Sequence, residues 1–479
     1  MSVNLTDTRI DHRAEKHQKM LANLQGNILI GHGRDRTVHL CVRFTAEPQA
    51  IATWVRGFAE RYVTSARQQL DDIELYREKK IVGPLSGNLF LTAAGYERLL
   101  GLTETDLERR FPEGQGARVT FRAGMEAAGG ELNDPDPSGW DVGYRGRRIH
   151  AMILLADDDL QRLQGVVESV LNSLAGIAAV LAEEYGAVLR NDADEAVEHF
   201  GYVDGRSQPL FFKQDLDKEA SEAGITRREW DPAAPLELVL VPDPNVDEED
   251  CFGSYLVFRK LEQNVKGFRI AEQALARALD LPAGDEERAG AMAVGRFRDG
   301  TPVTLSGKDG MDLLRANNFT YAGDAQGLQC PFHAHIRKVN PRGDTVRERN
   351  TPPEAERGRR IVRRGITYGR RSPSLRDAPE YGVGLLFMCF QSNIASQFAF
   401  LQRMWASNPG FVKPETGSDP IIGQRAAGED AGAQQWPAEW GRPETRPFDF
   451  GGYVTLKGGE FFFAPSIPFL KACHSGLSS

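Results

Sequence analysis

Cysteine is scarce in this chain, which has only five cysteines among 479 residues. They are scattered and odd in number, and no two of them stand in a Cys-x-x-Cys pair. This pattern indicates reduced thiols and argues against a disulfide framework. It also argues against zinc and iron–sulfur sites, which are built from clustered thiolates. The five positions are Cys41, Cys251, Cys330, Cys389 and Cys473.

Long apolar runs are lacking as well. No stretch of about 18 apolar residues occurs, so we expect no membrane-spanning helix and no membrane partner. Residues 1–20 are polar and charged, and they show neither the apolar region nor the cleavage site of a signal peptide. We therefore expect a cytoplasmic protein, with leaderless export left open.

Positive charge is in deficit, since 58 Lys and Arg residues stand against 67 Asp and Glu residues and leave a net charge of −9. The average surface of such a chain repels phosphates, so we expect no nucleic-acid partner. Local patches can still oppose the net sign, so small anionic substrates remain compatible with this composition.

The chain does contain a repeated strand–helix unit. In four places a run typical of a strand is followed by apolar residues at helical spacing. Two units fall in each half, which favours an α+β fold with two ferredoxin-like domains, each an antiparallel β-sheet with helices packed on one side. Proline-rich residues near 231–244 mark the approximate boundary, and we expect domains at residues 1–225 and 226–479. The four units are residues 38–62, 150–171, 254–275 and 385–401.

Residues 330–342, with the sequence CPFHAHIRKVNPR, hold two of the nine histidines and three basic side chains. A histidine can ligate a metal through a neutral ring nitrogen. Arginines nearby can hold carboxylates or phosphates in bidentate pairs. An axial nitrogen beside fixed positive charges suits an anionic metal cofactor, and haem with its two propionates is one. A histidine packed in the core is the plainer interpretation.

Residues 198–209, with the sequence EHFGYVDGRSQP, place Asp204 between Gly201 and Gly205. Glycine lets the backbone bend where a side chain would block it. The carboxylate is therefore expected on a short, stiff element, and a plain Asp-Gly turn is the alternative.

Together the two segments resemble the dye-decolourising peroxidase family, and residues 24–29 with 31–35 look like the N-terminus of its longer, class C-like bacterial branch. Asp204 falls on the family's Gly-x-x-Asp-Gly motif, and His335 falls on its proximal haem ligand. His333 stands at a position that the family leaves variable, and it is a rival ligand. Further matches follow in order over nearly the whole chain: LQGNIL at 24–29, VRRGITYG at 362–369, GLLF at 384–387, GSDPIIGQ at 417–424 and LKGGEFFFAPS at 456–466.

The resemblance implies a haem peroxidase that reduces hydrogen peroxide and oxidises dyes, phenolics or other bulky electron donors. It implies a dimeric α+β barrel type of fold, with haem in the second ferredoxin-like half. No Cys-x-x-Cys-His motif occurs, so the haem is expected to be non-covalent haem b. We expect a monomer or homodimer, and the sequence leaves the natural donor and any use of manganese open.

The resemblance also assigns roles to single residues. Asp204 matches the proton shuttle, and a carboxyl group with an ordinary pKa of about 3.9 makes an acidic activity optimum a reasonable expectation. Arg363 matches the arginine that stabilises developing negative charge, although Arg364 is adjacent. Arg342 matches an arginine that binds a haem propionate. Distal apolar side chains, for which core packing is the alternative, are matched by Leu385 and Phe387.

Two other functions remain as alternatives. A non-enzymatic haem-binding or haem-delivery protein on the same fold would use His335 but would need neither Asp204 nor Arg363. The joint presence of these two residues therefore favours the enzyme. If the family match were accidental, the histidines would be structural residues of a mixed α+β protein.

Bulky donors cannot enter a pocket sized for hydrogen peroxide, so we expect electrons to reach the haem from the surface through aromatic side chains. Trp405, which lies about four turns beyond Gln391 if the helix between them is unbroken, is the first candidate, and Tyr368 is the second. Two polar, glycine-rich stretches, residues 111–148 and 412–452, are expected to be long loops. We expect the second loop to cover part of the cofactor pocket.

Overall fold

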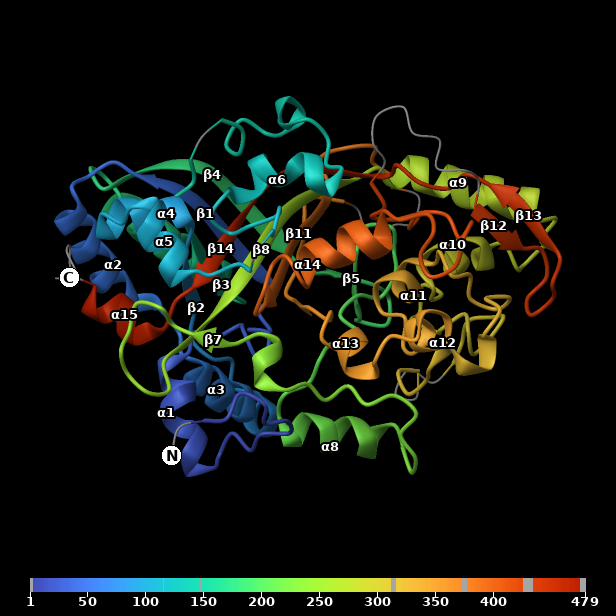
Figure 1. The fold of residues 1–479 in the computed structure, drawn as a ribbon, viewed down its shortest axis with the longest axis horizontal. Coiled ribbons are helices and arrows are strands. Elements are labelled where there is room, and N and C mark those ends of the chain that lie inside the picture. The colour runs from blue at the N-terminus through green and yellow to red at the C-terminus, as the bar shows by residue number, and fades with distance from the viewer. Residues whose placement is uncertain are drawn as a thin grey trace.

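The computed structural model describes residues 3–114, 116–146, 148–311, 316–371, 377–424 and 434–473. Ten strands form one antiparallel sheet (Figure 1), and they are β1 (Arg36–Phe44), β2 (Ser86–Leu91), β3 (Ala151–Asp157), β4 (Ala178–Ala187), β7 (Val241–Pro242), β8 (Phe252–Gln263), β9 (Val362–Arg363), β10 (Ile366–Tyr368), β11 (Gly384–Gln391) and β14 (Val454–Ala464).

The strand order divides the sheet into two similar halves. The N-terminal half has the order β4-β1-β3-β2, and the C-terminal half has the order β14-β8-β11-β10. If the four strands of each half are renumbered 1 to 4 in chain order, both orders read 4-1-3-2, as a ferredoxin-like sheet requires. The halves meet where β14 pairs with β2 and where β4 pairs with β10, and the pairing of β8 with β11 completes a closed ring. The predicted α+β fold of the dimeric α+β barrel type is confirmed, while the domain boundary at residue 225 stays a prediction.

Three of the predicted strand–helix units have their helix where the periodicity places it. The helix α2 (Pro48–Tyr62) follows β1, α7 (Leu160–Ser173) follows β3, and α9 (Val265–Ala278) follows β8. The side chain of Asn264 caps α9 by accepting the N–H of Gly267 at 2.7 Å. The apolar side of α9 is buried, which is the source of most helix stability in proteins.

The fourth unit differs from the prediction. After β11 the chain turns, and the helix begins only at Phe398, where α14 (Phe398–Phe400) continues into a π-helix, η4 (Leu401–Ala406). The side-chain oxygen of Gln397 accepts the N–H groups of Ser392 and Asn393 and so holds the turn. The unbroken helix assumed from Gln391 to Trp405 is therefore wrong.

The two stretches predicted to be long loops contain regular structure. The first includes α6 (Gly124–Leu132), which buries Met125, Ala128 and Leu132, and a short 3₁₀ helix, η1 (Pro137–Gly139). The second includes the hairpin of β12 (Gln434–Pro437) and β13 (Thr445–Phe448). Tertiary packing overrides the loop-like composition here, and residues 115, 147 and 425–433 of these stretches lie outside the described residues.

The remaining elements surround this frame. In Figure 1 the helices α9 to α13 gather at the end of the molecule away from both termini. Among the described residues, no helix is both long enough and apolar enough to cross a membrane. The other elements are α1 (Glu15–Asn23), α3 (Ala66–Lys79), α4 (Ala93–Leu100), α5 (Glu104–Arg110), β5 (Leu189–Arg190), β6 (Ala196–Val197), α8 (Lys213–Glu222), η2 (Leu236–Leu238), α10 (Glu287–Val294), η3 (Tyr321–Asp324), α11 (His335–Val339), α12 (Asp344–Arg349), α13 (Pro353–Arg357) and α15 (Ile467–Ala472).

Gly384, the first residue of β11, has no room for a side chain, since a Cβ there would lie 1.9 Å from the carbonyl oxygen of Leu261 on β8. We expect Gly384→Ala to lower the free energy of unfolding by about 1–3 kcal/mol, because the paired backbones would have to shift. Denaturant unfolding measures this difference. The matched control is Gly165→Ala, at an exposed position of α7 with open space around it, which should be neutral or stabilising. If Gly384→Ala and the wild type were equally stable, the close approach of the β11 and β8 backbones would be contradicted.

Candidate functional site

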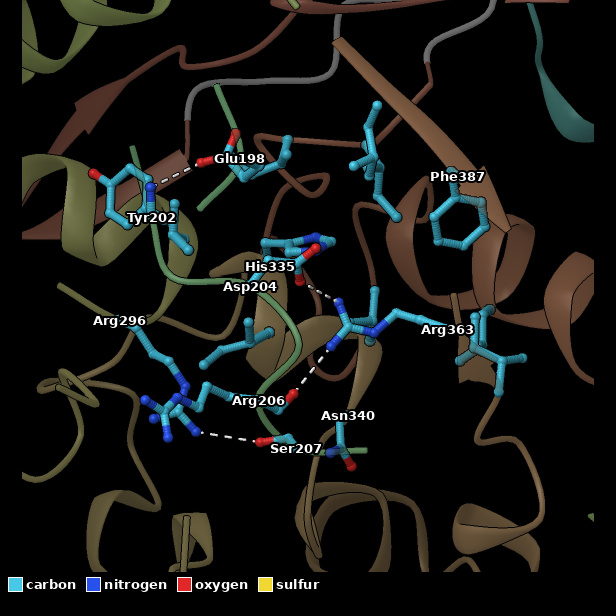
Figure 2. A pocket seen from close by; sticks show the side chains of 18 of the residues that line it. Glu198, Tyr202, Asp204, Arg206, Ser207, Arg296, His335, Asn340, Arg363 and Phe387 are labelled. Carbon is cyan, nitrogen blue, oxygen red and sulfur yellow. Dashed lines mark hydrogen bonds and ion pairs between the residues drawn. The ribbon is translucent and has the colours of Figure 1, made fainter. Parts of the chain in front are cut away.

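A cavity of about 270 Å³ lies against the C-terminal half of the sheet. Side chains of β8, β11 and β14 form one wall, and the segment 198–209, α11 and the stretch after α10 form the others. Figure 2 shows the polar side chains that converge on this space. All six site residues predicted from the sequence line it: Asp204, His335, Arg342, Arg363, Leu385 and Phe387.

His335 is held by a buried carboxylate. Its Nδ1 lies 2.8 Å from Oδ2 of Asp419, whose side chain has no exposed surface. Oδ1 of Asp419 in turn accepts the N–H groups of Ile421 and Ile422 at 2.8 and 3.1 Å. An Nδ1–H that donates to this carboxylate leaves Nε2 with its lone pair as the ring atom available to a ligand in the cavity.

Asp419 is the partner of His335 that the sequence could not identify. The available signal was its place in the motif GSDPIIGQ at residues 417–424, which matched the family without an assigned role. Three residues of the predicted loop 412–452 line the cavity, so the expectation that this stretch covers part of the pocket is confirmed. They are Ile421, Ile422 and Gln424.

The rival histidine, His333, is a core residue. Its side chain is 2% exposed, and its ring meets the ring of Trp436 edge-on with 4.3 Å between centroids. Burial lowers the pKa of His333 to about 3, which keeps the imidazole neutral. Of the two histidines in the motif, His335 is the one that lines the cavity.

Asp204 and Arg363 form an ion pair, with 3.1 Å between Oδ1 and Nη1 (Figure 2). Nη2 of Arg363 also donates to the carbonyl oxygen of Arg206 at 3.0 Å. Strand β9 fixes the backbone of the arginine, because Arg363 pairs with Cys389 of β11. The side chains of Asp204 and Arg363 are 32% and 35% exposed, so both remain accessible to a small molecule.

The neighbouring Arg364 points elsewhere. Its guanidinium donates to the carbonyl oxygens of Asn27 and Ile28 at 2.8 and 3.1 Å, and to that of Arg363 at 2.8 Å. It therefore ties the N-terminal LQGNIL motif to β9. Burial lowers the pKa of Arg364 to about 9. Arg363 is the last residue of β9 and Arg364 follows the strand, and only Arg363 of the pair lines the cavity.

Glu198 shapes the segment that carries Asp204, a role that sequence reasoning missed. Its carboxylate accepts the N–H groups of Phe200 and Tyr202 at 2.8 and 3.0 Å, and it accepts the side-chain amide of Gln263 on β8. Burial raises the pKa of the Glu198 carboxyl, and the negative charge of Asp204 adds to this effect. Glu198 thus links this part of the cavity wall to β8 of the sheet.

Two buried arginines converge on Ser207 at another wall. Arg342 donates to Oγ of Ser207 at 2.7 Å and Arg296 at 3.2 Å, and their other N–H groups donate mainly to backbone carbonyls. Neither forms an ion pair within the described part of the chain. Burial lowers the pKa of Arg296 to about 10 and that of Arg342 to about 9. A bound anion would relieve the cost of burying these two charges.

This arrangement fits an anionic, largely apolar cofactor with an iron centre. His335 offers one ring nitrogen, and among the described residues no carboxylate pairs with Arg296 or Arg342. Apolar side chains from β11, α14 and η4 complete the lining and exclude water, and they include Leu385, Phe387, Phe398 and Leu401. The donor set matches the one nitrogen and the carboxylate-binding groups that haem requires.

The two aromatic residues predicted to relay electrons are interior residues. Trp405 is 5% exposed, and its ring stacks on Phe411 with 5.0 Å between centroids. Tyr368 is 8% exposed on β10. Neither presents its ring to a bulky donor at the surface, although Trp405 belongs to η4, whose first residues Leu401 and Gln402 line the cavity.

Comparisons with known proteins give one consistent result. Residues 293–417 match the family model described as Dyp-type peroxidase, C-terminal. The chain is 43% identical to the multifunctional dye peroxidase DyP2 of Amycolatopsis sp. over 467 residues, which cover 95% of this chain and 96% of that protein. It is 30% identical to the dye-decolorizing peroxidase msp1 of Mycetinis scorodonius, over 95% of this chain and 88% of that one. The crystal structure of a DyP-type peroxidase from Anabaena sp. superimposes with a TM-score of 0.90 at 44% identity and covers 98% of both chains.

Proposed function

The chain belongs to the DyP-type peroxidase family, and from that premise we propose that it binds haem b non-covalently through His335, with Asp204 and Arg363 acting on hydrogen peroxide. The protein is a peroxidase that acts on dyes, as its relatives are. Phenolics and other bulky donors are part of the proposal. The observation that carries it is the meeting of these three side chains, from three separate parts of the sequence, in one cavity.

The residues divide into those that hold the cofactor and those that handle the peroxide. His335 would be the iron ligand, and Asp419 raises its basicity by accepting a hydrogen bond from Nδ1–H. Arg342 and Arg296 bind the propionates. When bound, haem supplies an iron at which hydrogen peroxide can be held and an electron reservoir for its reduction.

Asp204 transfers the proton, and Arg363 stabilises the negative charge. The Asp204 carboxylate takes a proton from the incoming peroxide and returns it to the leaving oxygen, which departs as water. Arg363 stabilises the negative charge that develops while the proton moves, and its guanidinium keeps its own charge throughout. Leu385 and Phe387 keep other water out, which strengthens both electrostatic interactions.

The alternative of a haem carrier without enzymatic activity is not favoured, because relatives matched along nearly the whole chain are peroxidases. A carrier would also need no acid–base group paired with a cation. Cytoplasmic location and a monomeric or homodimeric state, both inferred from the sequence, stay predictions. Two electrons and two protons, supplied by the donors and the solvent, complete the reduction of each peroxide to two waters.

The first prediction concerns the iron ligand. His335→Ala should lose the Soret absorption of the purified protein or leave a weakly held haem with a shifted band, because His335 is the one histidine among the described residues that line the cavity. His333→Ala is the matched control, since it removes a histidine from the same motif but from the core. Absorption spectra of both variants after haem reconstitution make the comparison. A normal spectrum for His335→Ala together with a lost one for His333→Ala would show that the ligand is His333.

The second prediction concerns the reaction with peroxide. Asp204→Ala should slow it by about 10²–10⁴-fold, as is typical for the loss of a general acid–base group. Arg363→Ala should slow it by about 10²–10³-fold, as for the loss of a positioned electrostatic donor. Stopped-flow absorption after mixing with one equivalent of peroxide gives the rates, with haem content checked first. The idea fails if both variants, fully loaded with haem, react at the wild-type rate.

The third prediction concerns bulky donors. If electrons pass through Trp405, Trp405→Phe should slow dye turnover while oxidation of small donors stays nearly intact, because phenylalanine keeps most of the packing on Phe411 but is harder to oxidise. Tyr368→Phe tests the second route in the same way. Steady-state rates with one bulky dye and one small phenol make the comparison. Equal dye turnover in the wild type and both variants would place electron entry elsewhere.

A further inference from the structure

Lys338 is a buried cation close to the iron ligand that the proposed chemistry does not use. It lies on α11, three residues after His335, and its side chain has no exposed surface. Its Nζ donates to the carbonyl oxygens of Asn408, Phe411 and Gly417 at 2.9, 2.8 and 2.5 Å. One side chain thus binds three points of the segment 408–417.

The three acceptors require the charged form of this lysine. An ammonium group has three N–H donors, whereas a neutral amine has only two. Burial lowers the pKa of Lys338 to about 7, and the negative charge of Asp419 opposes that change. The three carbonyl dipoles and Asp419 together stabilise the ammonium where water is excluded.

The segment held by Lys338 leads directly to Asp419. Gly417, whose carbonyl oxygen accepts the shortest of the three bonds, stands two residues before Asp419. The N–H of Asp419 donates to the carbonyl oxygen of Ala406 at 2.8 Å, and its carboxylate meets His335. Lys338 therefore joins the helix that carries the iron ligand to the segment that carries the ligand's hydrogen-bond acceptor.

We propose that Lys338 is a positioning residue for His335: its ammonium fixes Asp419 relative to α11 and offsets part of the Asp419 charge, so it sets how strongly Asp419 polarises the imidazole. This inference rests on the proposed function, since it assumes that His335 binds the iron. A carboxylate that draws the Nδ1 proton makes the imidazole a stronger electron donor and stabilises oxidised iron. A cation near that carboxylate weakens the effect.

The alternative is a purely structural role, in which Lys338 only stabilises the segment 408–417. The reduction potential of the iron separates the two roles, because loss of a purely structural contact lowers the stability of the protein without a defined shift of that potential. In the haem-loaded protein we expect Lys338→Met to shift the potential to more negative values and Asp419→Asn to shift it to more positive values. In the Asp419→Asn background, the shift caused by Lys338→Met should fall to less than half.

Lys413→Met is the matched control. It makes the same change in the same segment, but Lys413 pairs with Glu348 at 3.2 Å and is 36% exposed. Its potential should equal that of the wild type. The potentials come from spectroscopic redox titration, and thermal unfolding is recorded beside them. If Lys338→Met does not fold, Lys338→Gln replaces it, because an amide keeps two N–H donors without the charge.

Two outcomes would overturn the inference. An equal shift from Lys338→Met in both backgrounds would show that the cation acts directly on the haem, not through Asp419. A lowered unfolding temperature with an unchanged reduction potential would show that Lys338 only stabilises the segment 408–417. The variant His335→Ala separates these results from a failure of the proposed function: if it keeps the wild-type spectrum, the ligand assignment is wrong, whatever Lys338 does.

Discussion

Buried cations need acceptors for their N–H groups, and three cations in or beside the cavity wall meet this need in the same way. Arg342, Arg364 and Lys338 meet it mainly with backbone carbonyls from segments far away in the sequence. Each such cation fixes a stretch of chain that has little secondary structure of its own. The closed sheet supplies a rigid frame on one side, and these side chains supply the order on the other.

The same requirement gives the cavity its chemical character. Carbonyls and the hydroxyl of Ser207 satisfy the geometry of Arg296 and Arg342 but do not cancel their charge. A wall built in this way retains a positive field and attracts carboxylates. Had glutamates satisfied these arginines, the fold would be as well ordered, yet the site would have no preference for an anionic cofactor.

The sequence predicted the frame and named six residues that the structure brings to one cavity, because both predictions depend on local patterns. Strand–helix periodicity is readable within about twenty residues, and the motifs around Asp204 and His335 are contiguous. Asp419 could not be assigned, because it lies 84 residues from His335 and only folding brings them together. The choice between Arg363 and Arg364 depends on the distant partners that each side chain meets, and the delayed start of α14 depends on the turn held by Gln397.

The ion pair of Asp204 with Arg363 shows how stability and chemistry separate in this site. Both side chains are about one-third exposed, and pairs with that degree of exposure contribute about 0–1 kcal/mol to folding. The pair is therefore not needed to hold the fold together. Glu198 holds the segment that leads to Asp204, and β9 holds the backbone of Arg363. Since the surrounding structure fixes the geometry, the carboxylate can gain and lose a proton without loosening the cavity, as the proton transfer proposed for Asp204 requires.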